Sequence, residues 1–340
     1  MEEKIMIAVD AMGGDNAPGE IIKGVIAAVN KTKELSVILV GRQQAIASCL
    51  NGQSYPQGAI TVRNAEEVIE TADHPVEAIR HKKDSSLVVA LQMVRKGEAD
   101  ACISAGNSGA VLVGGQGIVG RIRGVQRPPF ASVMPTQNGA MMMLDCGANV
   151  DVRPEHLAQW AVLGSIYMKH VEGVKDPRVG IVNIGAEEEK GNALVKETFP
   201  LLKEMDSEGR IRFTGSCEAR DIPVGVCDVA VCDGFTGNVV IKMYEGVAKV
   251  LLSEIKGAIY STTKSKIGGL LIKDALKGTL NKFDVTRYGG APLLGLKSLV
   301  VKMHGSAKAA EVENAIYQCI QFHKEDITGK TAKYVEEQAG

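Results

Sequence analysis

Acidic or small polar residues followed closely by glycine recur along the chain, each time after a short apolar run. The first such stretch, "VDAMGGD", places Asp10, Gly13, Gly14 and Asp15 after the apolar residues 5–9. A simple connector needs turn residues, but it does not need two acids flanking a Gly-Gly pair. Glycine lets backbone approach a ligand closely, and successive N–H groups in such a turn can bind an anion. This loop is therefore a candidate wall of a substrate site.

Four later apolar runs end in the same kind of loop. The residues there that could contact a substrate are Ser104, Gly106, Asn107 and Ser108, then Asp145 and Asn149, then Asn183 and Gly185, and finally Asp233 and Asn238. In an open α/β sheet the ligand lies outside the carboxyl ends of the strands. The five strand ends are therefore expected to face one crevice.

Some of these residues also have a purely structural interpretation. The stretch "SAGNSGA" should open a helix at Asn107 or Ser108, so it could serve as a helix cap or as a phosphate or oxyanion site. The three glutamates after Asn183 could simply favour a helix N-terminus. Both interpretations stay open for these loops.

Cationic groups for an anionic substrate are present in two further stretches of the sequence. Lys82 and Lys83 precede an expected helix start at Asp84 or Ser85, and Lys190 follows the turn at residues 183–185. His304 lies between the last apolar strand and the last helix, where a histidine can move a proton. A solvated charge cluster and a packed histidine are the structural alternatives.

The elements that must position these residues alternate between short apolar runs and segments of helical period. Candidate strands are Ile5–Val9, Ser36–Val40, Ala59–Val62, Ala101–Ser104, Ala131–Pro135, Ala140–Leu144, Arg178–Ile184, Arg210–Thr214, Asp228–Cys232 and Leu299–Met303. Candidate helices are Glu20–Asn30, Ser85–Lys96, Pro154–Glu172, Gly191–Lys203, Asn238–Tyr260 and Ala307–Lys324. This alternation predicts an α/β fold of three layers, with helices on both faces of a largely parallel, mixed sheet.

No composition shift marks a domain boundary, so we expect one catalytic domain over residues 1–330 and a C-terminal tail over 331–340. Residues 260–285 are expected to protrude as an amphipathic helical segment. Residues 264–282 carry five lysines and one aspartate, and Ile272, Leu276, Leu280 and Phe283 form an apolar stripe. Such a segment could lie on an anionic membrane surface, or it could pack as an ordinary helix, for example at a dimer contact.

Composition excludes several functional classes. A formal net charge of −1 and 4% aromatic residues argue against nucleic-acid binding. Seven scattered cysteines without a C-x-x-C pair indicate reduced thiols and no structural zinc site. The acidic start of the chain is unlike a signal peptide, and no apolar run reaches the length of a membrane-spanning helix. A cytoplasmic protein is expected.

The ordered motifs D-A-M-G-G-D, S-A-G-N-S-G-A, L-D-C-G-A-N, N-I-G-A-E-E-E-K-G-N, D-G-F-T-G-N, G-G-A-P-L-L-G and H-G-S-A resemble the PlsX family of phosphate acyltransferases. The resemblance runs from about residue 5 to about residue 325. It implies transfer of a long-chain fatty acyl group from acyl carrier protein to inorganic phosphate, which gives acyl phosphate for phospholipid synthesis. It also implies a fold similar to phosphate acetyltransferases and to isocitrate and isopropylmalate dehydrogenases.

The resemblance further implies a cytoplasmic homodimer that associates peripherally with the membrane, near the next acyltransferase of the pathway. No metal and no cofactor are expected, because the acyl group arrives on the phosphopantetheine arm of the carrier protein. Phosphate would attack the thioester directly, and the aspartates would orient lysines or take a proton from hydrogen phosphate. The expected catalytic residues are Asp10, Lys82, Lys83, Asn107, Lys190 and His304.

Two other functions are compatible with parts of the sequence. Several strand-end aspartates could ligate Mg²⁺ in a nicotinamide-dependent decarboxylating dehydrogenase of similar fold. The basic segment could belong to a non-catalytic membrane scaffold. A scaffold needs no series of polar strand ends, and the long ordered motifs favour the acyltransferase.

Overall fold

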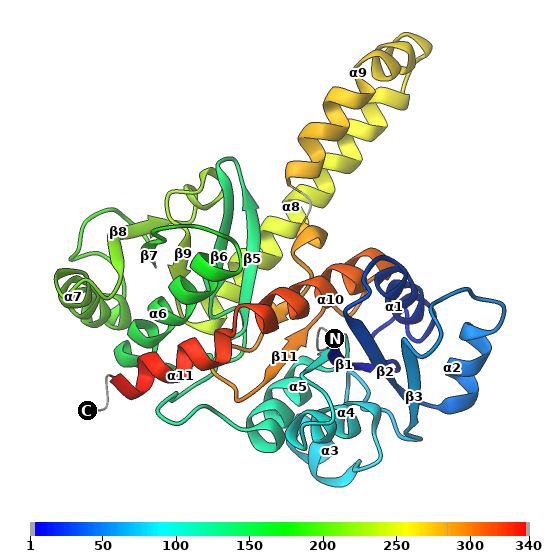
Figure 1. Ribbon diagram of the computed structural model, residues 1–340. Helices are drawn as coiled ribbons and strands as arrows, with labels where there is room; N and C mark the ends of the chain where they lie inside the picture. Colours follow the sequence, from blue (N-terminus) through cyan, green and yellow to red (C-terminus); the bar gives the residue numbers. More distant parts are fainter. Residues whose placement is uncertain (1–3, 284, 338–340) are drawn as a thin grey trace. The chain divides into compact units, whose positions relative to one another are not determined.

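The computed structural model describes residues 4–283 and 285–337, and their contacts divide the chain into two compact units. Unit 1 contains the described residues up to Ser132, Val162–Lys175 and the residues from Thr286 onward. Unit 2 contains Val133–Ala161 and Asp176–Val285. Each unit has its own sheet (Figure 1).

Unit 1 is built on a six-stranded sheet in the order β10-β11-β4-β1-β2-β3. The strands are β1 (Ile5–Asp10), β2 (Leu35–Gly41), β3 (Ile60–Asn64), β4 (Ala101–Ser104), β10 (Ala291–Pro292) and β11 (Leu299–Lys302). Only β10 runs antiparallel to its neighbour. The carboxyl ends of β1, β4 and β11 therefore lie next to one another at one edge of the sheet.

The helices of unit 1 include α1 (Gly19–Lys31), α2 (Gln43–Leu50), α3 (Pro75–His81), α4 (Ser86–Arg95), α5 (Ser108–Gly114), α10 (Ala309–Lys324) and α11 (Ile327–Glu337), with short turns η1 (Gly115–Val119) and η3 (Val285–Tyr288). In α1, the apolar residues Ile21, Ile22, Val25, Ala28 and Val29 recur at helical spacing and are buried. Helix α1 packs against α10, where a Cβ on Gly24 would lie only 2.5 Å from the Ala309 carbonyl oxygen.

Unit 2 is built on a five-stranded sheet in the order β5-β6-β9-β7-β8. Its strands are β5 (Ala131–Thr136), β6 (Gly139–Leu144), β7 (Arg178–Asn183), β8 (Arg212–Glu218) and β9 (Val229–Val231), and β6, β9, β7 and β8 pair in parallel. Its helices are α7 (Ala193–Ser207), α8 (Gly234–Tyr260), α9 (Thr263–Lys282) and the short η2 (Ile222–Val224). The boundary between the two units lies within α6 (Pro154–His170), after Ala161.

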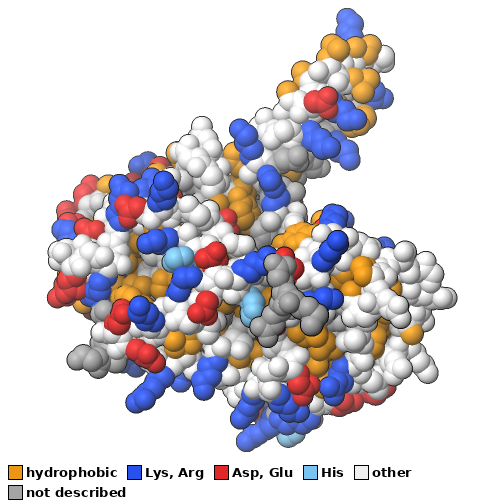
Figure 2. All heavy atoms as spheres, viewed as in Figure 1, with side chains coloured by type: hydrophobic (Ala, Val, Ile, Leu, Met, Phe, Trp, Pro, Cys, Tyr) orange, Lys and Arg blue, Asp and Glu red, His pale blue; other side chains and the backbone are white. Residues whose placement is uncertain are grey.

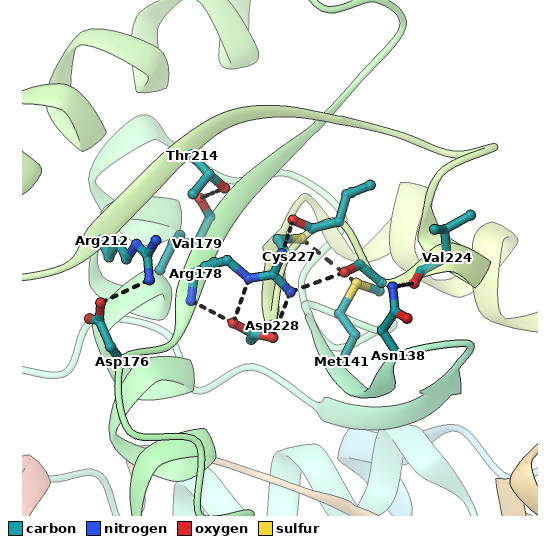
Figure 3. Close-up of polar contacts among 12 residues, drawn as sticks. Asn138, Met141, Asp176, Arg178, Val179, Arg212, Thr214, Val224, Cys227 and Asp228 are labelled. Carbon is teal, nitrogen blue, oxygen red and sulfur yellow. Dashed lines mark hydrogen bonds and ion pairs between the residues drawn. The ribbon is translucent and has the colours of Figure 1, made fainter.

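An ionic network holds the amino ends of the unit 2 strands (Figure 3). The predicted site residues follow the carboxyl ends of the same strands. The Arg178 guanidinium donates to both carboxylate oxygens of Asp228 at 3.0 Å and to the carbonyl oxygens of Gly225 and Val226 at 3.0 Å. Arg212 donates to Asp176 at 3.0 Å beside it. The Arg178 contacts join the starts of β7 and β9, and the Arg212 contact joins the start of β8 to the residues before β7. These contacts therefore stabilise the sheet.

The predicted α/β class with largely parallel strands is confirmed, but the expectation of one sheet is wrong, since the described residues form two. The contacts divide the chain into two compact units. That these units act as one catalytic domain over residues 1–330 stays a prediction. Residues 331–337 are not a tail, because they complete α11, whose Val335 is buried against Ile122 and Val125. Residues 338–340, and residue 284 of the expected 260–285 segment, lie outside the described residues.

Candidate functional site

The carboxylate of Asp10 is the centre of a hydrogen-bond network at the carboxyl edge of unit 1. Asp10 is 2% exposed. Its Oδ1 accepts the backbone N–H groups of Met12 at 3.2 Å and Gly13 at 3.1 Å, and its Oδ2 accepts the Ser104 hydroxyl at 2.6 Å. The Asp10 side chain therefore connects its own loop to the end of β4.

Burial raises the pKa of Asp10, and hydrogen bonds from Ser104, Ser86, Met12 and Gly13 oppose that rise. Ser86, which is not among the predicted site residues, is the first residue of α4 and is itself buried. The aspartates were expected to orient lysines or to take a proton, whereas the side-chain partner of Asp10 at this edge is the Ser104 hydroxyl. The Ser104 oxygen in turn accepts the Gly106 N–H at 3.0 Å.

Two loops meet at Gly13, and the meeting requires glycine. A Cβ on Gly13 would lie 2.5 Å from Asp10 Oδ2 and 2.7 Å from the Gly106 nitrogen. Gly14 has a φ of +97°, and a Cβ there would lie 2.8 Å from the Gly305 carbonyl oxygen. The Gly-Gly pair of the first loop thus lets three backbone segments approach one another closely.

The first and last motifs of the chain lie side by side. The Asp15 N–H donates to the Gly305 carbonyl at 2.8 Å, and the Asn16 amide donates to the Ser306 carbonyl at 2.9 Å. His304 Nδ1 lies 2.8 Å from the Ser306 hydroxyl. Asn16 and Ser306 are 290 residues apart in the sequence. Their loops meet because β1, β4 and β11 are adjacent in the sheet.

The side chains of Lys82 and Lys83 contact groups other than the strand-end aspartates. Lys82 Nζ lies 2.5 Å from Asp73 Oδ2 and 2.9 Å from the Val68 carbonyl, and Lys83 donates to the Ile79 carbonyl at 3.1 Å. Both lysines sit between α3 and α4 and precede the N-cap at Ser85, as the pattern predicted. The hypothesis that strand-end aspartates orient these two lysines is wrong for this geometry.

Asn107 serves as a helix cap. Its Oδ1 accepts the Ala110 N–H at 3.0 Å, and its amide donates to the carbonyls of Thr71 and Asp73 at 3.1 Å and of Glu70 at 3.3 Å. The capping interpretation of "SAGNSGA" is therefore confirmed for Asn107, and a catalytic role for it stays a prediction. Ser108, the first residue of α5, is exposed.

In unit 2, Asp145 is fully buried at the end of β6 and accepts four donors. They are the N–H groups of Gly147, Ala148 and Asn149, at 3.2, 3.1 and 2.5 Å, and the Asn149 side-chain amide at 3.0 Å. This carboxylate therefore shapes the 145–149 loop by accepting its backbone. Gly147 in that loop lies beside Asn238, whose side chain would be 3.5 Å from an added Cβ.

Asp233 caps α8, which begins earlier than the expected Asn238. The Asp233 carboxylate accepts the Thr236 N–H at 2.8 Å and the Thr236 hydroxyl at 2.7 Å. The first turn of α8 lies directly on the 145–149 loop, since a Cβ on Gly234 would be 2.7 Å from the Asn149 carbonyl oxygen. The ends of β6 and β9 thus form one connected edge.

Asn183 and Lys190 lie together at the end of β7. The Asn183 amide donates to the Ser216 hydroxyl at 3.0 Å, and its Oδ1 accepts the Ile184 N–H at 2.8 Å. Lys190 Nζ lies 2.7 Å from Glu187 Oε2, and this pairing raises the pKa of Lys190 and lowers that of Glu187. A Cβ on Gly185 would be 3.0 Å from Lys190 Nζ, so the ammonium lies over this glycine.

One charged residue at the unit 1 edge was missed. Lys302 ends β11 opposite Ser104 of β4, and burial lowers the pKa of its ammonium to about 8. The signal was a lysine at the end of an otherwise apolar strand, directly before "HGSA". The run 299–303 predicts a buried strand, and that pattern alone does not show which of its residues face a site.

The strand-end residues of each unit thus share one chemical character. Buried carboxylates accept backbone N–H groups and hydroxyls, glycines bring loops into contact, and lysines stand nearby. Such edges can order backbone donors around an anion and an acyl carbonyl. That the edges of the two units form one crevice stays a prediction.

Comparisons with known proteins identify the family of the chain. Residues 5–330 match the family model described as fatty acid synthesis protein. The chain is 46% identical to a phosphate acyltransferase of Clostridium novyi over 97% of this chain and 98% of the relative, and 47% identical to one of Bacillus licheniformis over 97% of each. A Streptococcus pyogenes phosphotransacetylase has a similar fold, with a TM-score of 0.60, 16% identity and coverage of 98% of this chain and 94% of that one. The chain belongs to the phosphate acyltransferase family of fatty acid synthesis proteins.

Proposed function

We propose that this protein transfers a long-chain fatty acyl group from acyl carrier protein to inorganic phosphate, reversibly, and supplies acyl phosphate for phosphatidic acid synthesis. The observation that carries the proposal is the near full-length identity to relatives named phosphate acyltransferase. The glycine loops and lysines at the strand ends support it, because both substrates present an anion or a polarised carbonyl to the site.

The reaction sets physical requirements that these residues can meet. Phosphate is a weak, strongly hydrated nucleophile, so the site must bind it, remove water and place it against the thioester carbonyl. Lysines and loop N–H groups are suited to binding the anion. Donors aimed at the carbonyl oxygen stabilise the charge that develops there. The thiolate of the carrier arm leaves readily, so direct attack needs no covalent enzyme intermediate.

Lys190 is a candidate for phosphate binding at the edge of unit 2. Its side chain is 49% exposed and pairs with Glu187, whose side chain is 51% exposed. An exposed pair of this kind contributes little stability, so its lysine can exchange the carboxylate for a phosphate at small cost. Asn183 and the 183–185 turn lie beside it.

The reaction is tested by mixing the purified protein with a long-chain acyl carrier protein, with and without inorganic phosphate. Release of carrier thiol is followed, and acyl phosphate is trapped with hydroxylamine. Phosphate-dependent release with trapped product is expected. Release without phosphate would indicate a thioesterase, and no release would favour the scaffold. Absorbance change with a nicotinamide cofactor and a 2-hydroxy acid would favour the dehydrogenase.

Asp10→Asn is expected to lower phosphate-dependent turnover about a hundredfold, because one carboxylate oxygen becomes an N–H group that cannot accept the Ser104 hydroxyl. Ser104 must then rotate, and the contact between the loops at Gly13 and Gly106 loosens. Turnover of the purified variant is measured by hydroxylamine trapping. The control is Asp176→Asn, an exposed carboxylate paired with Arg212. Near-normal turnover of Asp10→Asn would remove Asp10 from the catalytic residues.

Peripheral membrane contact through residues 264–283 is part of the same proposal. In α9 the side chains of Ile267, Leu270, Leu271 and Ile272 are 56%, 71%, 83% and 52% exposed. Figure 2 shows hydrophobic and basic side chains interleaved along the α8–α9 hairpin. In contrast, Leu276 of the predicted stripe is half-buried in the hairpin. None of the helices in the described part of the chain has both the length and the hydropathy of a membrane-spanning segment. The apolar side chains and lysines of α9 suit an anionic lipid surface, near the next acyltransferase.

Leu270→Ser with Leu271→Ser is expected to weaken binding to vesicles of anionic phospholipid about tenfold or more, because two exposed leucines lose their apolar burial in the membrane. Co-sedimentation with vesicles measures the partition. Ile184→Ser is the control, since Ile184 is 81% exposed outside the hairpin. Equal loss in both variants would contradict a membrane contact through α9.

The proposal also includes a homodimer. Exposed apolar side chains on α8, among them Val239, Met243 and Val250, offer an apolar surface for a second copy. Sedimentation of the purified chain, without lipid, distinguishes a dimer from a monomer.

A further inference from the structure

Lys302 occupies the third place in a row of polar side chains across the carboxyl edge of unit 1. In the register of the sheet Lys302 pairs with Ser104, and Val9 pairs with Ile103, so Asp10 lies next to Ser104 on the other side. The row therefore reads Asp10, Ser104, Lys302 on the three adjacent strands β1, β4 and β11. Residues at equal register in parallel strands project to the same face of the sheet.

The other two members of the row already have their polar atoms engaged. Ser104 donates its hydroxyl hydrogen to Asp10 and accepts the Gly106 N–H. Asp10 accepts from Ser104, Met12 and Gly13. Neither side chain can donate a hydrogen bond to an incoming phosphate without breaking this network. Of the three, Lys302 is the member that can supply a positive charge and a donor.

The Lys302 ammonium lies where three loops converge. Nζ donates to the carbonyl oxygens of Met303 and Ala105, the latter at 3.5 Å. A Cβ on Gly14 would lie 3.3 Å from that same Ala105 oxygen and 2.8 Å from the Gly305 oxygen. The loops 11–16, 105–107 and 303–306 therefore meet beside the lysine head.

The charge of Lys302 is compensated only from a distance. Its two hydrogen-bond acceptors are neutral carbonyls, and within residues 4–283 and 285–337 no carboxylate forms an ion pair with it. Desolvation lowers the pKa of its ammonium to about 8, while Asp10 and Asp15 act in the opposite direction. An ammonium has three N–H donors, so one can still be directed to an anion. By contrast, Lys82 is paired with Asp73 and Lys190 with Glu187.

We propose that Lys302 binds the phosphate substrate at the point where the loops 11–16, 105–107 and 303–306 converge. The inference rests on the proposed acyl transfer to phosphate and names a residue for its nucleophile. Asp10 and Ser104 then act as positioning residues that hold two of the loops around the ammonium. A dianion placed beside a partly desolvated lysine gains a strong, charge-assisted hydrogen bond.

The alternative is that Lys302 only balances the charges of Asp10 and Asp15. A structural counterion affects the melting temperature and overall turnover, but it does not change the affinity for phosphate selectively. The two roles are therefore separated by measuring phosphate affinity directly and by comparing the KM values of the two substrates.

The experiment uses the full-length protein with Lys302→Met, Lys302→Arg and, as an exposed control, Lys96→Met. Inorganic phosphate is titrated into each protein by calorimetry, and carrier-thiol release is measured while phosphate and acyl carrier protein are varied in turn. Lys302→Met should weaken phosphate binding and raise the phosphate KM about thirtyfold, with the KM for acyl carrier protein changed less than about twofold. Lys302→Arg should retain most of the affinity, because it keeps the charge.

Unchanged phosphate affinity in a folded Lys302→Met protein would overturn the proposal, as would equal effects on both KM values. If neither Lys302 variant folds, the residue is a structural counterion and the proposal is wrong. The proposed function fails separately, if the wild-type protein shows no phosphate-dependent release. In that case loss of phosphate binding in Lys302→Met would still identify an anion site at Lys302.

Discussion

Gly13→Ala is expected to reduce phosphate-dependent acyl transfer about a hundredfold. The new methyl group would lie 2.5 Å from Asp10 Oδ2 and 2.7 Å from the backbone nitrogen of Gly106, and neither is a flexible group. The loop after β1 and the loop after β4 must therefore separate. Displacing reacting groups by about 1 Å costs on the order of a hundredfold in rate. Acyl phosphate trapped with hydroxylamine per unit time measures the effect.

Gly19→Ala is the matched control for this prediction. It lies at the start of α1, six residues further along, and an added Cβ there meets no atom within 4 Å. Its turnover should equal that of the wild type, and its melting temperature should be the same or slightly higher. If Gly13→Ala retains more than about a third of wild-type turnover, the loop contact at Gly106 does not position reacting groups.

The strands were predictable where an apolar run is bounded by charges and turn residues. Strand β4 has the expected bounds, because the apolar residues 101–103 follow Asp100 and end in a glycine loop. The division into two sheets could not be read from such runs. Which strands pair depends on contacts between distant segments, as when β11 joins β4 nearly 200 residues earlier. Helix α11 was missed because it buries only a narrow stripe, formed by Ile327, Thr331 and Val335.

The candidate site was predictable as a set of strand ends but not as a set of partners. A polar residue followed by glycine at the end of a strand is a local signal, and it located Asp10, Ser104 and Asp145 at strand ends, where the structure buries them. That they contact the substrate stays a prediction. The partner of a lysine is not local. Lys82 pairs with Asp73 because the chain between them folds back, whereas Lys302 faces the site because its strand lies beside β4.

The close approach of α8 to the end of β6 leads to the largest expected effect on stability. A Cβ on Gly237 would lie 2.0 Å from the carbonyl oxygen of Asp145 and 3.0 Å from the Cys232 sulfur. Hydrogen bonds hold the Asp145 backbone in place. Its N–H donates to the Cys232 carbonyl at 2.9 Å, and its buried side chain accepts four donors. Gly237→Ala should therefore destabilise unit 2 by about 3 kcal/mol or more, through overpacking against backbone.

Gly246→Ala in the same helix tests whether packing or helix propensity decides the outcome. Gly246 is exposed, and an added Cβ meets no atom within 4 Å. Alanine favours a helix over glycine by about 0.5–1 kcal/mol, so this variant should be as stable as the wild type or more stable. Calorimetric melting of the full chain should show a transition lowered by about 6–12 °C for Gly237→Ala and unchanged or raised for Gly246→Ala. Equal shifts in both variants would mean that the first turn of α8 does not pack on Asp145 as described. Opposite shifts would show that the start of this helix packs on the Asp145 backbone through a contact that only glycine permits. The position of the loop that carries Asp145 and Asn149 would then depend on that contact.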